Sequence, residues 1–222
     1  NLTLDKEDIY DIAKTVVKVI EDKDMMKSEE NDSSNDVNDI VRFTEVNSKV
    51  EVGRLKPGSV FKIADREWIL LEHREKSNGC FIITKDFMDV APEFDVSTNN
   101  WRYSNLRLNL QNTLKSEIED YFCDESKIML TERNLMALDG TTYGTLFEEI
   151  SLLTLDEYRL YRDYIAHITG CHWLLTPDST SNYMVCYVDT DGTIDVDYNG
   201  DKNYVCPVCT LKSNALVEKV KS

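Results

Sequence analysis

The residues of this chain that are best suited to contact a ligand lie near its C-terminus. Between Thr176 and Tyr204, tyrosines are interleaved with aspartates, asparagines and serines. A tyrosine ring offers a large contact area with few rotatable bonds, and amide or carboxylate groups adapt their hydrogen bonds to the surface that they meet. We expect ligand contacts from ten residues: Asn182, Tyr183, Tyr187, Asp189, Asp195, Asp197, Tyr198, Asn199, Asn203 and Tyr204.

Two groups of side chains carry atoms that can bind metal ions. Cys206 and Cys209 have Cys-x-x-Cys spacing, and with Cys171 and His172 they would supply four ligands for tetrahedral zinc. The five aspartates between positions 189 and 201 could instead surround Ca²⁺. However, the cysteines lie in a strand-like run, and alternating aspartates more often form a solvated strand face. We therefore predict no metal ligand and no cofactor.

The sequence does not contain a recognisable catalytic motif. Its three histidines, His73, His167 and His172, do not accompany a Gly-x-Ser-x-Gly nucleophile elbow, and glycine-rich phosphate-binding loops are missing. Adjacent carboxylates such as Glu148 and Glu149 are expected by chance among 41 acidic residues. We therefore expect a protein that is not an enzyme.

The candidate contact residues must be positioned by strands and tight turns. Met184–Val188 and Thr193–Val196 have the alternation of strands, and the Asp-Thr-Asp-Gly between them suits a hairpin turn. The alternation predicts one packed face and one solvent-exposed face, with Tyr187, Asp195 and Asp197 on the exposed side.

Further elements precede this hairpin. The pattern predicts strands at Val60–Ile63, Trp68–Glu72 and Cys80–Thr84, joined as an antiparallel meander. Apolar residues at helical spacing predict helices over Ser104–Tyr121 and Leu155–Ile168. Helices placed between early and late strands indicate an α+β fold rather than a doubly wound sheet.

The N-terminal part has a different composition. Residues 5–20 carry an apolar stripe typical of an amphipathic helix, and residues 27–36 contain no apolar side chain. We therefore expect an N-terminal helix over 1–26, a polar linker over 27–49 and one main domain over 50–222. The helix could dock on its own domain or form a homo-oligomer by pairing with another copy.

Composition limits the classes of partner. At 222 residues and 41% hydrophobic content the chain can bury a core without disulfides, so its six cysteines are expected to be reduced. A net charge of −16 disfavours nucleic acids and anionic membrane surfaces as partners. Neither an export signal nor a transmembrane stretch is recognisable, and the localisation, virion-associated or cytoplasmic, stays open.

Four motifs, taken in order, resemble a domain family found in phage, prophage and gut-bacterial genomes. They cover about Leu55 to Leu211. The motifs are EWILL at Glu67–Leu71, WRYSNLRLNLQ at Trp101–Gln111, SLLTLDEY at Ser151–Tyr158, and a C-terminal signature of HWLLTP at His172–Pro177, VDTDG at Val188–Gly192 and VCPVCTL at Val205–Leu211.

This resemblance implies a C-type-lectin-like fold with antiparallel strands and two helices. The family is similar to the variable proteins of diversity-generating retroelements and, more distantly, to formylglycine-generating enzymes. In the variable proteins the segment matching Thr176–Tyr204 contacts ligands. Leu175 and Cys206 replace arginines of the family pattern, so any role of those arginines is lost here.

Together, these observations favour a non-catalytic domain, associated with phage or prophage, that recognises a protein or a glycan. Two alternatives remain open. The first is an acidic phage-encoded inhibitor that occupies a basic groove of a host protein. The second is a formylglycine-generating-like oxygenase, although its active-site cysteine pair has no identifiable counterpart in this sequence.

Overall fold

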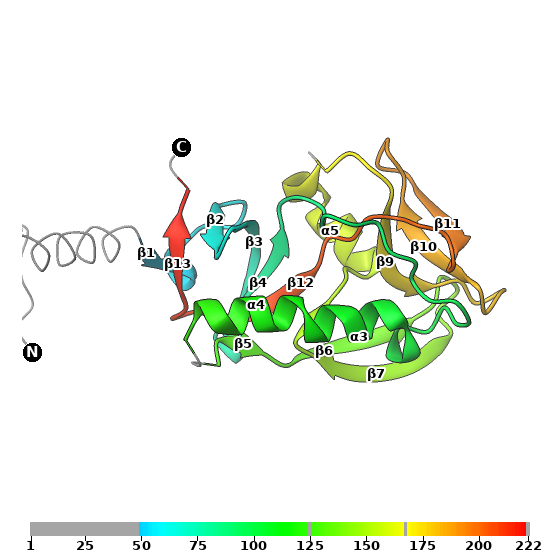
Figure 1. Cartoon of the computed structure of the whole chain (residues 1–222), viewed down its shortest axis with the longest axis horizontal. Helices are drawn as coiled ribbons and strands as arrows, with labels where there is room; N and C mark the ends of the chain where they lie inside the picture. The colour runs from blue at the N-terminus through cyan, green and yellow to red at the C-terminus, as the bar shows by residue number, and fades with distance from the viewer. Residues whose placement is uncertain (1–48, 124–125, 167, 221–222) are drawn as a thin grey trace, which may run out of the picture. The chain divides into compact units, whose positions relative to one another are not determined.

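A large antiparallel sheet contains eight of the strands (Figure 1). The computed structural model describes residues 49–123, 126–166 and 168–220. Strand order is β1-β13-β2-β3-β4-β12-β5, and β8 also pairs with β12. The bounds are β1 Lys49–Glu51, β2 Val60–Ile63, β3 Arg66–Arg74, β4 Gly79–Thr84, β5 Ile128–Met129, β8 Ile150–Ser151, β12 Val208–Lys212 and β13 Leu216–Lys219.

The central strands of this sheet are covered on both faces. Along β3, Leu70 belongs to one apolar cluster, whereas Ile69 and Leu71 belong to a second cluster. Along β4, Ile82 belongs to the first of these clusters and Phe81 to the second. This double burial explains why β3 and β4 are continuous apolar runs rather than alternating ones.

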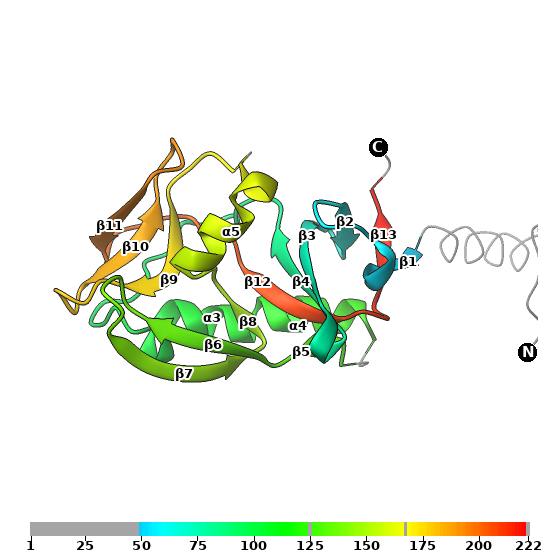
Figure 2. The ribbon, with the colours of Figure 1, turned by 180° about the vertical axis from the view of Figure 1, so that it is seen from behind.

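Five further strands form two smaller sheets, which Figure 2 shows from behind. One has the order β11-β10-β9, and the other is a two-stranded ribbon of β6 and β7. All of their pairings are antiparallel. Their bounds are β6 Thr131–Met136, β7 Thr142–Glu148, β9 His172–Pro177, β10 Met184–Val188 and β11 Ile194–Tyr198.

The first predicted helix is divided in two. It consists of α3 (Asn105–Asn112) and α4 (Leu114–Tyr121), which are separated at Thr113. The Thr113 hydroxyl donates to the carbonyl of Asn109 at 2.9 Å, a contact that often bends helices. Both halves nevertheless bury one stripe against the core. The buried residues of the stripe are Leu106, Leu110, Leu114 and Ile118.

The second predicted helix, α5, spans Leu155–Ile165 and ends before the expected Ile168. It begins with a capping box in which the Thr154 side chain accepts the Glu157 N–H and the Glu157 carboxylate accepts the Thr154 N–H. Its buried face packs on the second apolar cluster.

The α+β class and the β2-β3-β4 meander predicted from the sequence are confirmed. The described residues lie within one compact unit, Asn47–Ser222. The predicted helix over 1–26 and linker over 27–49 lie outside the described residues, except for Lys49 in β1. Among the residues described, no helix is long and apolar enough to cross a bilayer.

Candidate functional site

The hairpin of β10 and β11 carries five of the ten predicted contact residues. Its strands pair in register from Met184 opposite Tyr198 to Val188 opposite Ile194. The prediction of one packed and one exposed face is wrong for β10. Val185 and Cys186 point to opposite faces, and both are fully buried because each face meets one of the two apolar clusters.

Two of the predicted tyrosines are turned toward other parts of the domain. Tyr187 is half-buried, with its ring 6.5 Å from that of Trp173 in an edge-on arrangement. Tyr204 is 42% exposed, but its ring stacks on Phe87 at 4.6 Å. The predicted set of tyrosines is therefore divided among three places rather than forming one surface.

Tyr183 and Tyr198 form the one aromatic pair in the predicted set. Their ring centroids are 6.1 Å apart, and the residues are 50% and 45% exposed. We refer to these two residues as the tyrosine pair. A backbone hydrogen bond of 2.7 Å from Asn199 N–H to the Tyr183 carbonyl connects the segments that carry them.

The backbone segments that carry the tyrosine pair form a frame held by Asn99 and Gly200, two residues that the sequence did not single out. The Asn99 amide nitrogen lies 2.8, 2.8 and 3.0 Å from three carbonyl oxygens of the segment before and at the start of β10. Asn99 is 1% exposed, so this contact is shielded from water. Gly200 lies against the Tyr198 ring, where an added Cβ would come within 2.8 Å of Cε1. Both features restrict the positions of the two rings.

Two of the predicted asparagines are buried and cannot reach a partner in this structure. Asn199 is 0% exposed, and its amide nitrogen and oxygen contact no hydrogen-bonding group. Asn203 is 5% exposed and donates to Asp197 at 2.9 Å. Their assignment as contact residues is therefore not supported, because the turn that follows β11 folds back onto the 94–95 segment. Asn182 remains exposed.

The aspartates of β11 hydrogen-bond to their own strand. The Val196 and Tyr198 N–H groups face away from β10. This direction follows from the pairing register and from the backbone hydrogen bonds at the two ends of the hairpin, because N–H groups alternate in direction along a strand. The Asp195 carboxylate accepts from Val196 N–H at 2.8 Å, and the Asp197 carboxylate accepts from Tyr198 N–H at 2.9 Å. These contacts occupy donors that an added strand would need.

Two other acidic groups nearby are also engaged. The hydrogen bond from the Thr190 N–H, with one from the Cys171 thiol, lowers the pKa of Asp189. A hydrogen bond with the Asp197 carboxyl raises the pKa of the exposed Asp201. Within the described part of the chain, no three His, Cys, Asp or Glu side chains are arranged to hold a metal ion.

The Cys-x-x-Cys pair does not converge on one point. Cys206 is buried in one apolar cluster, and Cys209 is buried in the other. Burial raises the pKa of both thiols. Cys80 and Cys186 are also buried, whereas Cys123 is exposed. Cys123 has a φ of 52° and lies two residues after the end of α4.

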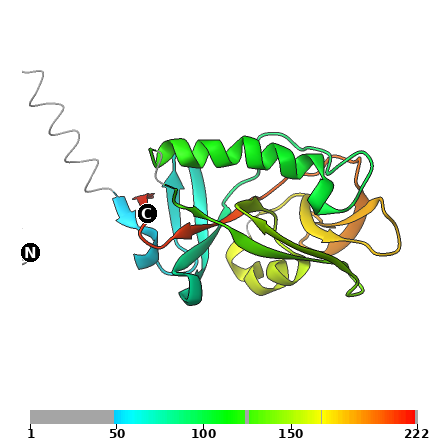
Figure 3. The ribbon, with the colours of Figure 1, turned by 90° about the horizontal axis from the view of Figure 1, so that it is seen from below.

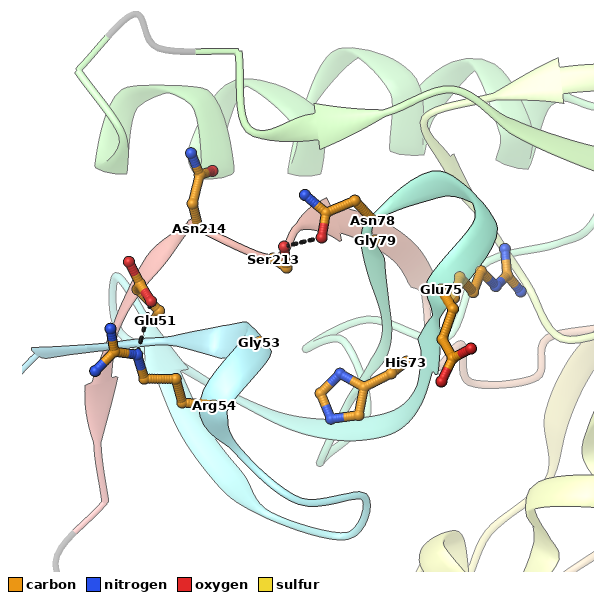
Figure 4. Close-up of a pocket in the computed structure, with 10 residues that line it drawn as sticks. Glu51, Gly53, Arg54, His73, Glu75, Asn78, Gly79, Ser213 and Asn214 are labelled. Carbon is orange, nitrogen blue, oxygen red and sulfur yellow. Dashed lines mark hydrogen bonds and ion pairs between the residues drawn. The ribbon is translucent and has the colours of Figure 1, made fainter.

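A polar hollow of about 280 Å³ lies beside the β3-β4 turn (Figure 4). Its walls carry an ion pair between Arg54 and Glu51 at 2.8 Å. The His73 ring lies 2.8 Å from the Leu55 carbonyl through Nε2 and 3.5 Å from the Cys80 thiol through Nδ1. Burial raises the pKa of Cys80 to about 11, so this thiol stays protonated and is not an activated nucleophile at neutral pH.

Residues of the sequence motifs hold the elements together around these surfaces. The Ser104 hydroxyl caps α3 by accepting the Arg107 N–H at 3.1 Å. The Arg107 side chain and the Gln111 amide both donate to the buried carboxylate of Glu148, at 2.8 and 2.6 Å. In α5, the Glu157 carboxylate also binds Arg133, which is 2% exposed. These polar residues therefore have structural roles.

Comparison with known proteins gives no relative: no family model, no curated protein and no solved structure matches this chain. Function is therefore inferred from the geometry of the described residues. The strongest feature among the predicted contact residues is the exposed tyrosine pair on its restrained frame.

Proposed function

We propose that this protein is a non-catalytic recognition domain that binds a protein or a glycan through the tyrosine pair. The observation that carries the proposal is that two half-exposed rings, 6.1 Å apart, lie on a frame held by Asn99 and Gly200. Rings that are ordered before binding lose little conformational entropy when a ligand arrives. Tyrosine also combines an apolar ring, which stacks on a sugar or an apolar side chain, with a hydroxyl that hydrogen-bonds.

The proposal includes a C-type-lectin-like core, with an association with phage or prophage. Its support is the order of the sequence motifs and the α+β arrangement of two helical segments with antiparallel strands. The structural roles of Ser104, Arg107 and Glu157 support the view that these motifs specify a fold. The ligand class depends on the tyrosine pair and not on the motifs.

The test is binding to arrays of immobilised glycans and peptides. We expect the Tyr183→Ala/Tyr198→Ala variant to lose the interactions of the wild-type protein, with affinity for any ligand falling by about tenfold or more. The matched control is Tyr164→Ala, which removes a tyrosine of similar exposure (39%) on α5. Equal binding by the double variant and the wild type would refute the proposal.

The acidic-inhibitor alternative predicts a different response to salt. Its support is the net charge of −16, and its partner would be rich in lysine and arginine. Affinity for such a partner would fall steeply between about 0.1 M and about 0.5 M salt, whereas stacking on tyrosines would be much less sensitive. Steep salt dependence with no effect of the tyrosine substitutions would favour the inhibitor function.

A further inference from the structure

The ribbon of β6 and β7 exposes apolar side chains on its outer face, on either side of the exposed polar pair Asn134 and Thr145. Along β6 the side chains alternate, with Arg133 and Leu135 buried and Met136 41% exposed. The alternation extends to both flanks of the strand, where Leu130 is 65% and Leu138 is 45% exposed. Exposed apolar side chains that gather into a patch mark surfaces that another molecule covers, whereas single scattered ones do not.

The second strand adds to the same face. Phe147 of β7 is 64% exposed and lies directly opposite the exposed Glu132 of β6. In contrast, Leu146 is partly buried against the first apolar cluster. β7 forms the lower rim of the domain in Figure 1, and Figure 3 views this side directly. The ribbon therefore packs its inner side on the core and leaves Phe147 in solvent.

A hollow of about 380 Å³ continues this surface at the tip of the ribbon. Met136 and Leu138 line it from the ribbon, and Leu155 and Asp156 line it from the start of α5. Its size is comparable to that of pockets that accept small ligands or a large side chain. The outer face therefore leads into a recess with both apolar and polar walls.

Acidic groups border the apolar residues. Glu132 lies between the two ends of the face, and Asp156 lies at the hollow, where Arg159 pairs with it at 3.2 Å. At the ribbon tip, hydrogen bonds from Thr141 and Ser179 lower the pKa of Asp139, so this carboxylate is ionised at neutral pH. With a net charge of −16, two copies of the chain repel each other, whereas a basic partner is attracted.

We infer that the outer face of the β6-β7 ribbon, with its adjoining hollow, is a docking surface for a partner segment that presents a row of apolar side chains bordered by lysine or arginine. We define this ribbon surface by Leu130, Glu132, Met136, Leu138 and Phe147. It is distinct from the tyrosine pair, so the inference goes beyond the proposed function and does not depend on it.

The test uses a synthetic amphipathic helix of leucine and lysine, about 18 residues long, titrated into the full chain and followed by fluorescence anisotropy. We expect it to bind, and we expect Met136→Ser/Phe147→Ser to weaken binding by about tenfold or more because apolar contacts are lost without a change of charge. Leu216→Ser is the matched control on β13, at 50% exposure, and should change the affinity less than about twofold.

Three results would overturn the inference. The first is failure of the Leu/Lys peptide to bind, or binding that Met136→Ser/Phe147→Ser leaves unchanged. The second is equal binding of a peptide in which every lysine is replaced by glutamate, since the acidic border predicts that this peptide is repelled. The third is a dimer of the free protein, seen by analytical ultracentrifugation, that Met136→Ser/Phe147→Ser dissociates, because the occupant would then be a second copy.

Discussion

The ion pair between Arg133 and Glu157 provides the most direct test of the packing between the ribbon and α5. The two groups form a bidentate contact at 2.7 and 2.5 Å, and Arg133 also donates to the Leu152 carbonyl at 2.7 Å. The side chain of Arg133 is 2% exposed and that of Glu157 is 20% exposed. Removal of one partner therefore leaves a charge with little access to water.

The two single substitutions should differ in cost. Loss of one member of a buried pair costs about 3–5 kcal/mol. We expect Arg133→Met to lower the free energy of unfolding by about 3 kcal/mol, since Glu157 retains some solvent and its bond to Thr154 N–H. Glu157→Leu should cost about 1 kcal/mol more, because it strands the deeply buried guanidinium and also removes half of the capping box.

The measurement is urea unfolding followed by fluorescence of the three buried tryptophans. The double variant Arg133→Met/Glu157→Leu should be more stable than Glu157→Leu alone, since neither charge is then left unpaired. The control is Arg159→Met, which breaks an exposed pair with Asp156 and should change stability by less than about 1 kcal/mol. If Arg133→Met costs no more than Arg159→Met, the buried-pair reasoning is refuted.

Three further predictions concern buried groups. Burial lowers the pKa of His172 below its unfolded value of about 6.5, so the unfolded chain binds more protons than the folded one. The free energy of unfolding therefore falls as the pH drops from about 7 to about 5. His172→Gln should flatten this pH dependence in urea titrations, and an unchanged slope would contradict the prediction. Asn199→Leu replaces a buried amide without hydrogen-bonding partners and should raise the free energy of unfolding by about 1 kcal/mol, whereas a loss of similar size would indicate that the amide is satisfied. Burial raises the pKa of Cys80 to about 11 and that of Cys186 to about 12. A thiol reagent should therefore modify the exposed Cys123 in the native protein and reach Cys80 and Cys186 only on unfolding. Mass spectrometry of digests would show which thiols are modified.

Much of the local structure was predictable from the sequence because it depends on neighbouring residues. The strand Val60–Ile63 and the strand Met184–Val188 have the bounds that alternation predicted. The stripe Leu106–Ile118 is buried as its spacing indicated, although Thr113 divides the helix through a side-chain bond to the backbone. The ribbon β6-β7 was not predicted, since its exposed apolar residues obscure the polar alternation expected of a surface hairpin.

The candidate site was less predictable, because its exposure depends on distant contacts. Composition and turn residues placed tyrosines and aspartates on the C-terminal hairpin, which the structure contains. They could not reveal that β10 is covered on both faces, or that Tyr204 stacks on Phe87, more than a hundred positions earlier in the chain.

The sequence by itself determined the β2-β3-β4 meander, the β10-β11 hairpin, the helix stripes and the strongly acidic charge, since these follow from periodicity, turn residues and composition. Only the tertiary structure decided which polar and aromatic side chains reach solvent. Tyr183 and Tyr198 are exposed together, whereas Asn199, the residue after Tyr198, is buried. The reason is physical: alternation along a strand assigns side chains to two faces, but packing of other segments against each face determines whether that face meets water.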